Sequence, residues 1–263
     1  MRLPLRSRLA PELRRELEEG PTWAYEWRLG RGTVTQVHRP FLPELYGSCQ
    51  EMIEAPVREV LTAAGRDATG IDIACNEGWF AHRLLDWGAR RVVAVDSREM
   101  NVRRARLLRD HYGIDPTRLE LIEGDLFDLD SERLGRFDVV NLLGVLYHLE
   151  NPMGALRIAR SLAKSLCVIE SQVVHLDQPA EEGKPPEDRP TGEVAALLVH
   201  REPDAATRIS PLAAMPGILS LIPTPAAIVE MALAAGFADA EVLQPPDRYR
   251  ELRSERAIVL ARC

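Results

Sequence analysis

The stretch Gly-Ile-Asp-Ile-Ala-Cys-Asn-Glu-Gly at residues 70–78 decides the fold of this chain. It begins as a short apolar run of strand length and passes, from Gly78 to Trp87, into a run with helical spacing of apolar residues. Ala74, Asn76 and Gly78 stand at alternate positions between the two runs, where small or turn-forming residues let a backbone turn tightly and approach a ligand closely. The stretch therefore predicts a strand, a ligand-binding loop and a helix in direct succession.

The same alternation of strand-like and helix-like runs continues along the chain. After Gly70 to Ala74, strands are expected at Arg91 to Val95, Leu119 to Ile122, Phe137 to Leu142, Leu166 to Val173, Ala238 to Val242 and Ala257 to Ala261. Further helices are expected at Glu54 to Ala64, Arg98 to about His111, Asn151 to Ala163 and Pro225 to Ala235. Strands separated by helices of this length form βαβ crossovers, so the sequence predicts an α/β doubly wound core with a parallel sheet covered on both faces. The last two strands are expected to pair antiparallel.

Four segments are expected around this core. Residues 1–55 are a cap or lid segment rich in turn residues, and residues 56–175 form the ligand-binding core. Residues 176–222 are an insertion or lid over the substrate site, with a polar, Pro-rich stretch at Ala180 to Glu193. Residues 223–263 supply a helix and a strand pair that complete the core.

Charge and composition narrow the function classes. The 263 residues carry 33 Lys plus Arg against 40 Asp plus Glu, a formal net charge of −7. A negative net charge disfavours a protein whose main function is to bind a nucleic-acid phosphate backbone, although it does not exclude a local basic face. The four cysteines show no CxxC pair and no zinc-ligand spacing, so neither a disulfide framework nor a metal site is expected.

The location expected from the sequence is the cytoplasm. The N-terminus, Met1 to Ala10, alternates Arg with Leu and has no apolar core of a signal peptide. The longest stretch without a charge, Ile209 to Val229, contains Pro211, Pro216, Pro223 and Pro225, which would break a lipid-exposed helix. No membrane partner is therefore expected.

Acidic residues follow three consecutive strands of the expected sheet. Asp72 closes the first strand, Asp96 follows the second and Asp125 follows the third. The carboxyl ends of parallel strands are where open α/β sheets bind ligands. The loop is not a GxGxxG fingerprint, and its acidic Asp72 and Glu77 favour a zwitterionic, overall cationic ligand over a pyrophosphate. Each acid taken alone is more often a helix N-cap or a surface carboxylate than a ligand-binding residue, and the three together are more specific than any one.

Together, Asp72 to Gly78, Asp96, Gly124-Asp125 and Phe137 to Val140 resemble the class I S-adenosylmethionine-dependent methyltransferases, over about residues 55–175. The run Gly144 to Pro152 (GVLYHLENP) is similar to the tRNA wobble-uridine carboxymethyltransferase family and its relatives. The resemblance implies a Rossmann-like seven-stranded sheet, mostly parallel with an antiparallel C-terminal strand, and S-adenosyl-L-methionine as cofactor. Ala74 stands where the family usually has Gly.

The resemblance also implies roles for individual residues. Asp72 and the backbone of Ala74, Cys75, Asn76 and Gly78 would hold the methionine end of the cofactor, with Trp79 beside them. Asp96 with Ser97 would hold the ribose, and Asp125 with Leu126 the adenine. Asn141, at the end of the fourth strand, would face the methionine amine or the reacting atom. Alternatively, it is a polar residue at a strand end with no role in binding.

Two residues past the fourth strand are the catalytic candidates. His148 can act as a base near neutrality. The alternative role is structural, in which the histidine is hydrogen-bonded into the following helix. In the resembling family Tyr147 helps hold an acidic group on a carboxylated cofactor, and a lysine from the N-terminal segment assists it. This chain has no lysine before Lys164, which favours ordinary S-adenosylmethionine.

Three functions are compatible with these residues. The favoured hypothesis is methyl transfer to an O or N atom of a small-molecule acceptor. The alternative is a tRNA-modifying methyl- or carboxymethyltransferase, which would need a continuous basic patch; Arg103, Arg104, Arg106 and Arg109 cluster on one helix, but such a run is usually a solvated face. A third reading is a cofactor-binding protein without catalysis. The oligomeric state stays open, with a homodimer as one alternative.

Overall fold

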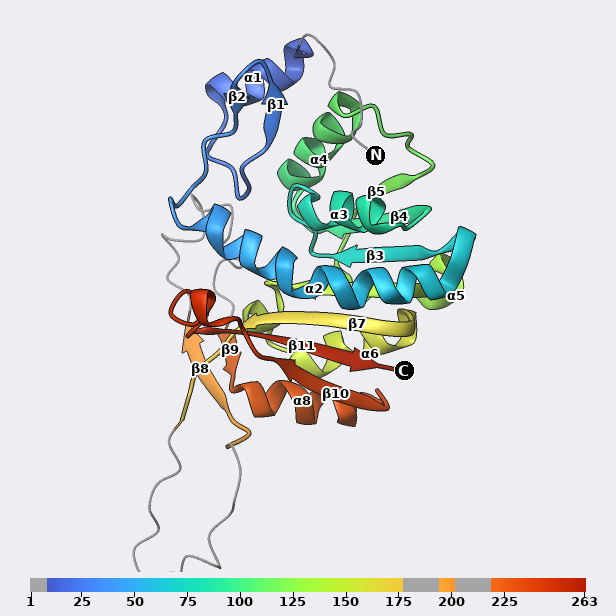
Figure 1. The fold of residues 1–263 in the computed structure, drawn as a ribbon, viewed down its shortest axis with the longest axis vertical. Helices are drawn as coiled ribbons and strands as arrows, with labels where there is room; N and C mark the ends of the chain where they lie inside the picture. The colour runs from blue at the N-terminus through green and yellow to red at the C-terminus, as the bar shows by residue number, and fades with distance from the viewer. Residues whose placement is uncertain (1–8, 177–193, 202–218) are drawn as a thin grey trace, which may run out of the picture.

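A seven-stranded sheet forms the centre of the computed structural model, which describes residues 9–176, 194–201 and 219–263 (Figure 1). Its strands lie in the order β10 (Asp239–Leu243), β11 (Arg256–Arg262), β7 (Ala163–Gln172), β6 (Phe137–Leu143), β3 (Thr69–Ile73), β4 (Arg91–Asp96) and β5 (Leu119–Glu123). Strands β3 to β7 pair in parallel, whereas β11 is antiparallel to both of its neighbours. The expected Rossmann-like doubly wound fold is therefore confirmed, together with its antiparallel C-terminal strand.

The chain direction across the sheet reverses at β3. Strands β4 and β5 follow on one side of β3, and β6 and β7 follow on the other. Crossovers that diverge in this way leave a crevice at the carboxyl ends of the central strands, which is the place where open α/β sheets bind ligands.

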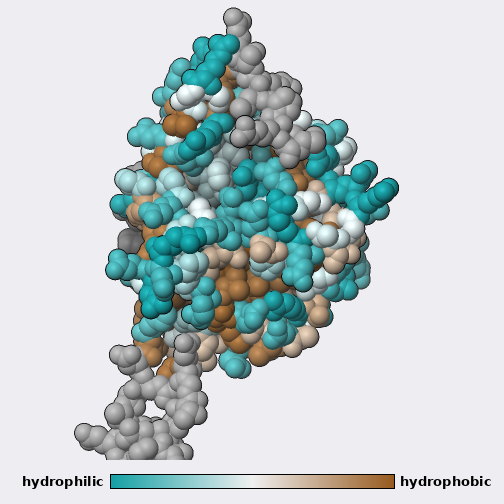
Figure 2. Space-filling view, viewed as in Figure 1, coloured by the Kyte–Doolittle hydropathy of each residue, from teal (hydrophilic) through white to brown (hydrophobic). Residues whose placement is uncertain are grey.

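Helices cover both faces of the sheet. Helices α2 (Leu42–Ala64), α3 (Trp79–Trp87) and α4 (Glu99–His111) lie on one face, and α6 (Pro152–Leu162) and α8 (Pro225–Ala234) lie on the other, where the short α5 (Ser131–Leu134) also packs (Figure 1). On the face that Figure 2 shows, hydrophobic residues gather below α2, over the part of the sheet that holds β10 and β11.

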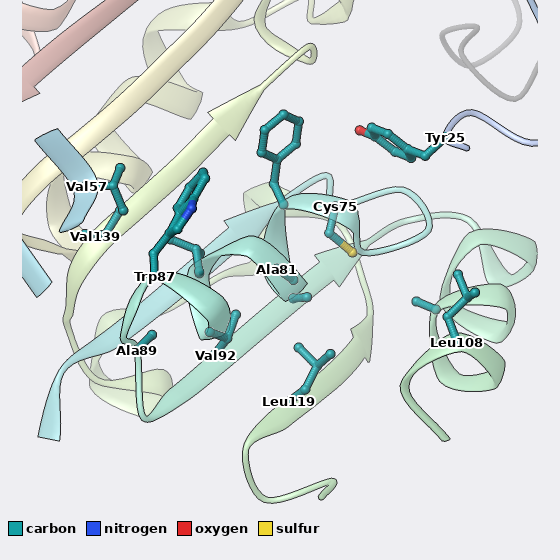
Figure 3. Close-up of a cluster of buried hydrophobic side chains, with 14 of the residues drawn as sticks. Tyr25, Val57, Cys75, Ala81, Trp87, Ala89, Val92, Leu108, Leu119 and Val139 are labelled. Atoms are coloured by element: carbon teal, nitrogen blue, oxygen red, sulfur yellow. The ribbon is translucent and has the colours of Figure 1, made fainter. Parts of the chain in front are cut away.

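Alternation along each strand divides the core into two clusters. In β4, Val92 and Ala94 pack with α3 and α4, while Val93 and Val95 pack with α6. Figure 3 shows the first cluster, in which Val92 lies near Ala81 of α3. Strands buried on both faces are apolar at most positions, which explains their nearly continuous apolar runs.

Helix α2 is longer than the sequence analysis predicted. It begins at Leu42 instead of Glu54 and runs without a break across residues 55 and 56, where the cap and core segments were divided. Pro43 was taken as a turn residue, but a proline in the first helical turn costs nothing because its position needs no backbone N–H donor. The cap segment and the core therefore share one helix.

A buried arginine of α4 joins the N-terminal segment to the core. Arg104 has no exposed surface, and its guanidinium lies 4.2 Å from the ring centroid of Trp23. It donates hydrogen bonds to Glu16 Oε1 (2.7 Å), Glu77 Oε1 (3.2 Å) and the carbonyl oxygens of Pro21 (2.6 Å) and Thr22 (3.1 Å). Glu16 belongs to α1 (Pro11–Glu19), and the segment continues through the short strands β1 (Arg28–Gly30) and β2 (Thr33–Val34).

Two expectations are wrong at this cluster. Glu77 does not face a ligand: it is fully buried and accepts hydrogen bonds from the backbone N–H groups of Ala24 (2.9 Å) and Tyr25 (3.3 Å). The arginine run of α4 is not simply a solvated face, because Arg104 is buried and Arg103 pairs with Glu16. Both were misjudged because the N-terminal segment packs on α4, which no local pattern indicates.

Strands β8 (Leu197–Arg201) and β9 (Leu219–Pro223) form a separate two-stranded antiparallel sheet. The expected Pro-rich loop, Ala180 to Glu193, lies outside the described residues, as does the first half of the uncharged stretch from Ile209. The described part of the uncharged stretch, residues 219–229, forms β9 and the first half of α8 (Pro225–Ala234). Within the described ranges, no helix has the length and apolar character needed to cross a bilayer.

We expect Arg104→Ala to lower the free energy of unfolding by about 3–5 kcal/mol, because it leaves the buried carboxylate of Glu77 without a charged partner and removes one of the two arginines that pair with Glu16. Urea denaturation followed by circular dichroism measures this loss. Arg106→Ala on the same helix is the control: its guanidinium makes one 3.4 Å contact, to the Leu121 carbonyl, and should change stability by no more than about 0.5 kcal/mol. Equal effects of the two substitutions would contradict the role given to Arg104.

Candidate active site

A cavity of about 560 Å³ lies at the carboxyl ends of β3 to β6. Its volume falls within the roughly 300–1,000 Å³ typical of small-molecule sites. Eight of the residues predicted for the site line it: Ala74, Asn76, Asp96, Ser97, Asp125, Leu126, Tyr147 and His148. The sheet topology thus brings together residues that are up to 74 positions apart in the sequence (148 minus 74).

The loop after β3 has an unusual backbone. Ala74 (φ 58°), Asn76 (φ 52°) and Gly78 (φ 83°) all lie in the left-handed region, in which a side chain with a Cβ is strained. Such strain is tolerated where the surrounding structure enforces it and is common at ligand sites. A Cβ added at Gly78 would also lie 3.5 Å from the Cβ of Ala105, so this position places α3 close against α4.

Asp96 organises this loop. It is buried, and its Oδ2 accepts from the backbone N–H of Asn76 (2.8 Å), while its Oδ1 accepts from Arg98 N–H (3.0 Å) and from Asn101 Nδ2 (3.0 Å). Burial raises the pKa of the carboxyl group. A carboxylate offers about four acceptor positions, so roughly one is left for a ligand beyond these three bonds.

Asp125 caps the short helix η2 (Leu126–Asp128). Its Oδ1 accepts from the backbone N–H of Phe127 (2.9 Å), so the N-cap alternative is confirmed. The same side chain lines the cavity next to Leu126 and Phe127. Capping uses one carboxylate oxygen, and the other is left for a ligand.

Asp72 and Asn141 lie beneath the loop instead of lining the cavity. They are directly opposite each other on β3 and β6 and are almost fully buried. Within the described part of the chain, Asp72 Oδ2 and both polar atoms of the Asn141 side chain have no hydrogen-bond partner. Burial raises the pKa of Asp72 to about 8. Buried polar groups are normally satisfied, so this pair fits a site that is completed by a ligand or by water.

Three predicted cofactor residues lie away from the cavity. Cys75 is buried, and its backbone N–H donates to the Val95 carbonyl (2.9 Å), which joins the loop to β4. Trp79 stacks on Tyr25 with ring centroids 5.7 Å apart. Gly78 caps α3 from the outer side of the loop. These residues shape the loop without facing the cavity.

The opposite wall of the cavity contains a buried ionic cluster that the sequence analysis missed. Glu170 of β7 pairs with Arg256 through two hydrogen bonds (2.7 and 2.8 Å) and with Arg253 (3.2 Å). Arg256 lies over the ring of Tyr147, 5.2 Å from its centroid. The available signal was Glu170 itself, a carboxylate that directly follows the apolar run Leu166 to Ile169 of a strand. Such a residue is rarely buried unless its charge is paired.

Tyr147 and His148 lie together on the short helix η3 (Leu146–His148), with ring centroids 4.0 Å apart. Both line the cavity, as does Tyr46 of α2. His38 shares a hydrogen bond with Thr22 Oγ1 (3.1 Å), and His175 Nε2 donates to the Ser254 carbonyl oxygen (2.9 Å). His200 is exposed on β8. None of these three histidines lines the cavity.

Several known proteins resemble this chain in sequence. The ribosomal RNA small subunit methyltransferase A of Rhodospirillum rubrum is 32% identical over 108 residues, which cover 40% of this chain and 36% of that protein. The tRNA U34 carboxymethyltransferase of Actinobacillus pleuropneumoniae serotype 3 is 32% identical over 88 residues, 34% of this chain and 27% of that protein. The chain thus spans only about a third of the length of these curated relatives.

Solved structures show the same fold over more of the chain. The N-terminal domain of EvdMO1 with SAH bound has a TM-score of 0.68 at 21% identity and covers 96% of both chains. The magnesium protoporphyrin IX methyltransferase of Synechocystis PCC 6803 with bound SAM has a TM-score of 0.53 at 16% identity, over 89% of this chain and 86% of that one.

A family match decides the classification. Residues 48–242 match the family described as a methyltransferase domain, which is more than half of the chain. The chain belongs to this methyltransferase-domain family, and the expected enzyme class, a class I S-adenosylmethionine-dependent methyltransferase, is confirmed.

Proposed function

We propose that the chain transfers the methyl group of S-adenosylmethionine to an O or N atom of a small-molecule acceptor. The observation that carries this proposal is that the predicted cofactor residues after β4 and β5 and the catalytic candidates Tyr147 and His148 line the same cavity. A cofactor held at the strand ends would leave the rest of this space for the acceptor.

The residues fit the cofactor part by part. Asp96 with Ser97 would take the ribose, and Asp125 with Leu126 the adenine. The loop from Ala74 would hold the methionine end, and the unpartnered atoms of Asp72 and Asn141 beneath it would be satisfied there directly or through water. The sulfonium supplies an activated methyl group, and the acidic residues around it favour its positive charge.

The proposed reaction is an in-line displacement. A bond forms between the acceptor atom and the methyl carbon as the sulfur–carbon bond breaks, and the bonding electron pair stays on sulfur. Such a reaction depends chiefly on alignment and on exclusion of water. We assign His148 to the remaining step, acceptance of the proton that the acceptor O–H or N–H loses.

A small acceptor is favoured over tRNA by the placement of the arginines on α4. Arg104 is buried, Arg103 pairs with Glu16, and Arg109 pairs with Asp110. These side chains therefore do not supply the continuous free basic patch that binding of a phosphate backbone needs. The aromatic and apolar residues of the cavity, which include Tyr25, Tyr46 and Phe80, suit an enclosed small molecule.

We expect Asp96→Ala and Asp96→Asn to weaken binding of S-adenosylhomocysteine at least tenfold, because each removes charged acceptors from the ribose position. Isothermal titration calorimetry measures the affinities. Asp128→Ala changes an exposed acid of η2 that does not line the cavity, and should bind like the unchanged protein. Unchanged affinity in both Asp96 variants would contradict the ribose assignment.

We expect His148→Ala to lower turnover by about 10²–10⁴-fold and to change S-adenosylhomocysteine affinity less than threefold, as befits a base that does not hold the cofactor. Release of S-adenosylhomocysteine in the presence of small hydroxylated or amino compounds, and separately of tRNA, measures turnover. His175→Ala is the control outside the cavity. Unaltered rates in His148→Ala would assign this residue a structural role, and turnover with tRNA alone would overturn the small-molecule proposal.

A further inference from the structure

One wall of the cavity consists of aromatic and apolar side chains. It is formed by the N-terminal segment and the first two turns of α2, and we call it the α2 wall; its residues are Tyr25, Phe41, Leu42, Leu45, Tyr46 and Cys49. The charged residues that the described part of the chain contributes to the cavity all lie on other elements. The α2 wall therefore offers a ligand apolar surface and not charge.

The ionisable side chains of the α2 wall stay neutral. Burial raises the pKa of the Cys49 thiol to about 12, and it raises the pKa values of the Tyr25 and Tyr46 hydroxyls well above their ordinary value. A buried group favours its neutral form because the protein interior solvates charge poorly. The α2 wall consequently carries no charge at neutral pH.

Phe41 is the most exposed residue of the α2 wall. It lies at the N-terminal end of α2 and is 52% exposed, whereas Leu42 and Leu45 in the first turn of the helix are 2% and 7% exposed. Covering apolar surface gains free energy in proportion to the area that is removed from water. A ligand in the cavity can therefore gain affinity by covering the ring of Phe41.

Three aromatic rings that line the cavity are packed in a fixed arrangement. The centroid of the Tyr25 ring lies 4.4 Å from that of Tyr46 and 6.2 Å from that of Phe80, which it meets edge to face. Tyr25 also stacks on Trp79, with the two ring planes 3° apart. Aromatic rings favour offset and edge-to-face contacts with one another, so a further ring can join this cluster. Because packing already holds these side chains, little conformational entropy is lost when a ligand binds.

The α2 wall is separate from the parts of the chain assigned to the cofactor. Those parts follow β3, β4 and β5, whereas the residues of the α2 wall precede all three strands in the sequence. His148, the assigned proton acceptor, lines the same cavity. A molecule on the α2 wall therefore shares one space with the strand ends and with His148.

We propose that the α2 wall binds an aromatic ring of the methyl acceptor, with Phe41 as a specificity-determining residue that covers the ring. The inference rests on the proposed small-molecule methyl transfer and narrows its substrate class to aromatic compounds that carry a hydroxyl or amino group. In the transfer, this O or N atom forms a bond to the methyl carbon, sulfur keeps the electron pair of the broken bond, and the proton passes to His148. A polyol would leave its hydroxyl groups desolvated against the α2 wall, which is unfavourable.

The test compares 4-ethylphenol with its saturated counterpart 4-ethylcyclohexanol and with the polyol myo-inositol. Each probe is titrated calorimetrically into the full-length protein saturated with S-adenosylhomocysteine. We expect 4-ethylphenol to bind about three- to tenfold more tightly than 4-ethylcyclohexanol, because contacts between aromatic rings add to the burial of area. It should bind at least tenfold more tightly than myo-inositol.

Phe41→Leu keeps an apolar side chain but removes the ring. It should abolish the preference for 4-ethylphenol over 4-ethylcyclohexanol and leave S-adenosylhomocysteine affinity within threefold, whereas Phe41→Trp should retain the preference. Phe127→Leu is the matched control, because Phe127 is 42% exposed and lines the same cavity, but follows β5 next to Asp125 and Leu126. It should retain the full preference.

Equal binding of 4-ethylphenol and 4-ethylcyclohexanol, tighter binding of myo-inositol, or no binding of 4-ethylphenol at tens of millimolar would overturn the aromatic site. Loss of the preference in Phe127→Leu but not in Phe41→Leu would overturn it as well. Competition between 4-ethylphenol and S-adenosylhomocysteine would also do so, by assigning the α2 wall to the adenine of the cofactor. Failure of the protein to bind S-adenosylhomocysteine at all would instead reject the proposed function.

Discussion

The ion pairs of Arg104 are the constraint on which the ligand-binding end of this protein depends. Glu77 belongs to the loop that follows the first strand of the core, and Arg104 belongs to the helix after the second strand. Their contact joins these two elements, and Glu16 joins both to the N-terminal segment. The left-handed backbone at Ala74 and Asn76 is strained in isolation, so the loop needs this kind of external support. A side chain that never faces the cavity thereby helps to shape it.

The cavity has two electrostatically distinct ends. Carboxyl groups follow the strands at the end where a cationic cofactor is expected. Burial raises the pKa values of Asp72 and Asp96, and a bound cation would counter this by favouring their charged forms. The other end is held by Glu170 with two arginines, of which Arg256 reaches the cavity. In a low-dielectric site such a separation orients a zwitterion or an acid strongly, because charges interact more strongly there than in water. The net charge of the whole chain, −7, does not indicate that one end of the cavity is positively charged.

Local sequence patterns were sufficient for the sheet and for part of the site. Each apolar run between residues 70 and 173 became a strand within a few residues of its expected ends, since strands buried on both faces are apolar at most positions. Asp96, Asp125 and Tyr147 were identified because the carboxyl ends of parallel strands converge on one edge. The start of α2 was missed because Pro43 was interpreted as a turn residue. Proline is also compatible with the first turn of a helix, which is where Pro43 lies.

The sequence by itself determined the doubly wound sheet, its antiparallel last strand and the edge at which ligands bind, because the periodicity of apolar residues and the alternation of strands with helices along the chain are local features. Only the tertiary structure decided which polar side chains face the cavity. Glu77 and Asp125 both follow strands, but Glu77 turns away to meet Arg104, whereas Asp125 lines the cavity. Arg256 and Glu170 come together from strands that are 86 residues apart, and such pairing arises from sheet register, which no local pattern encodes.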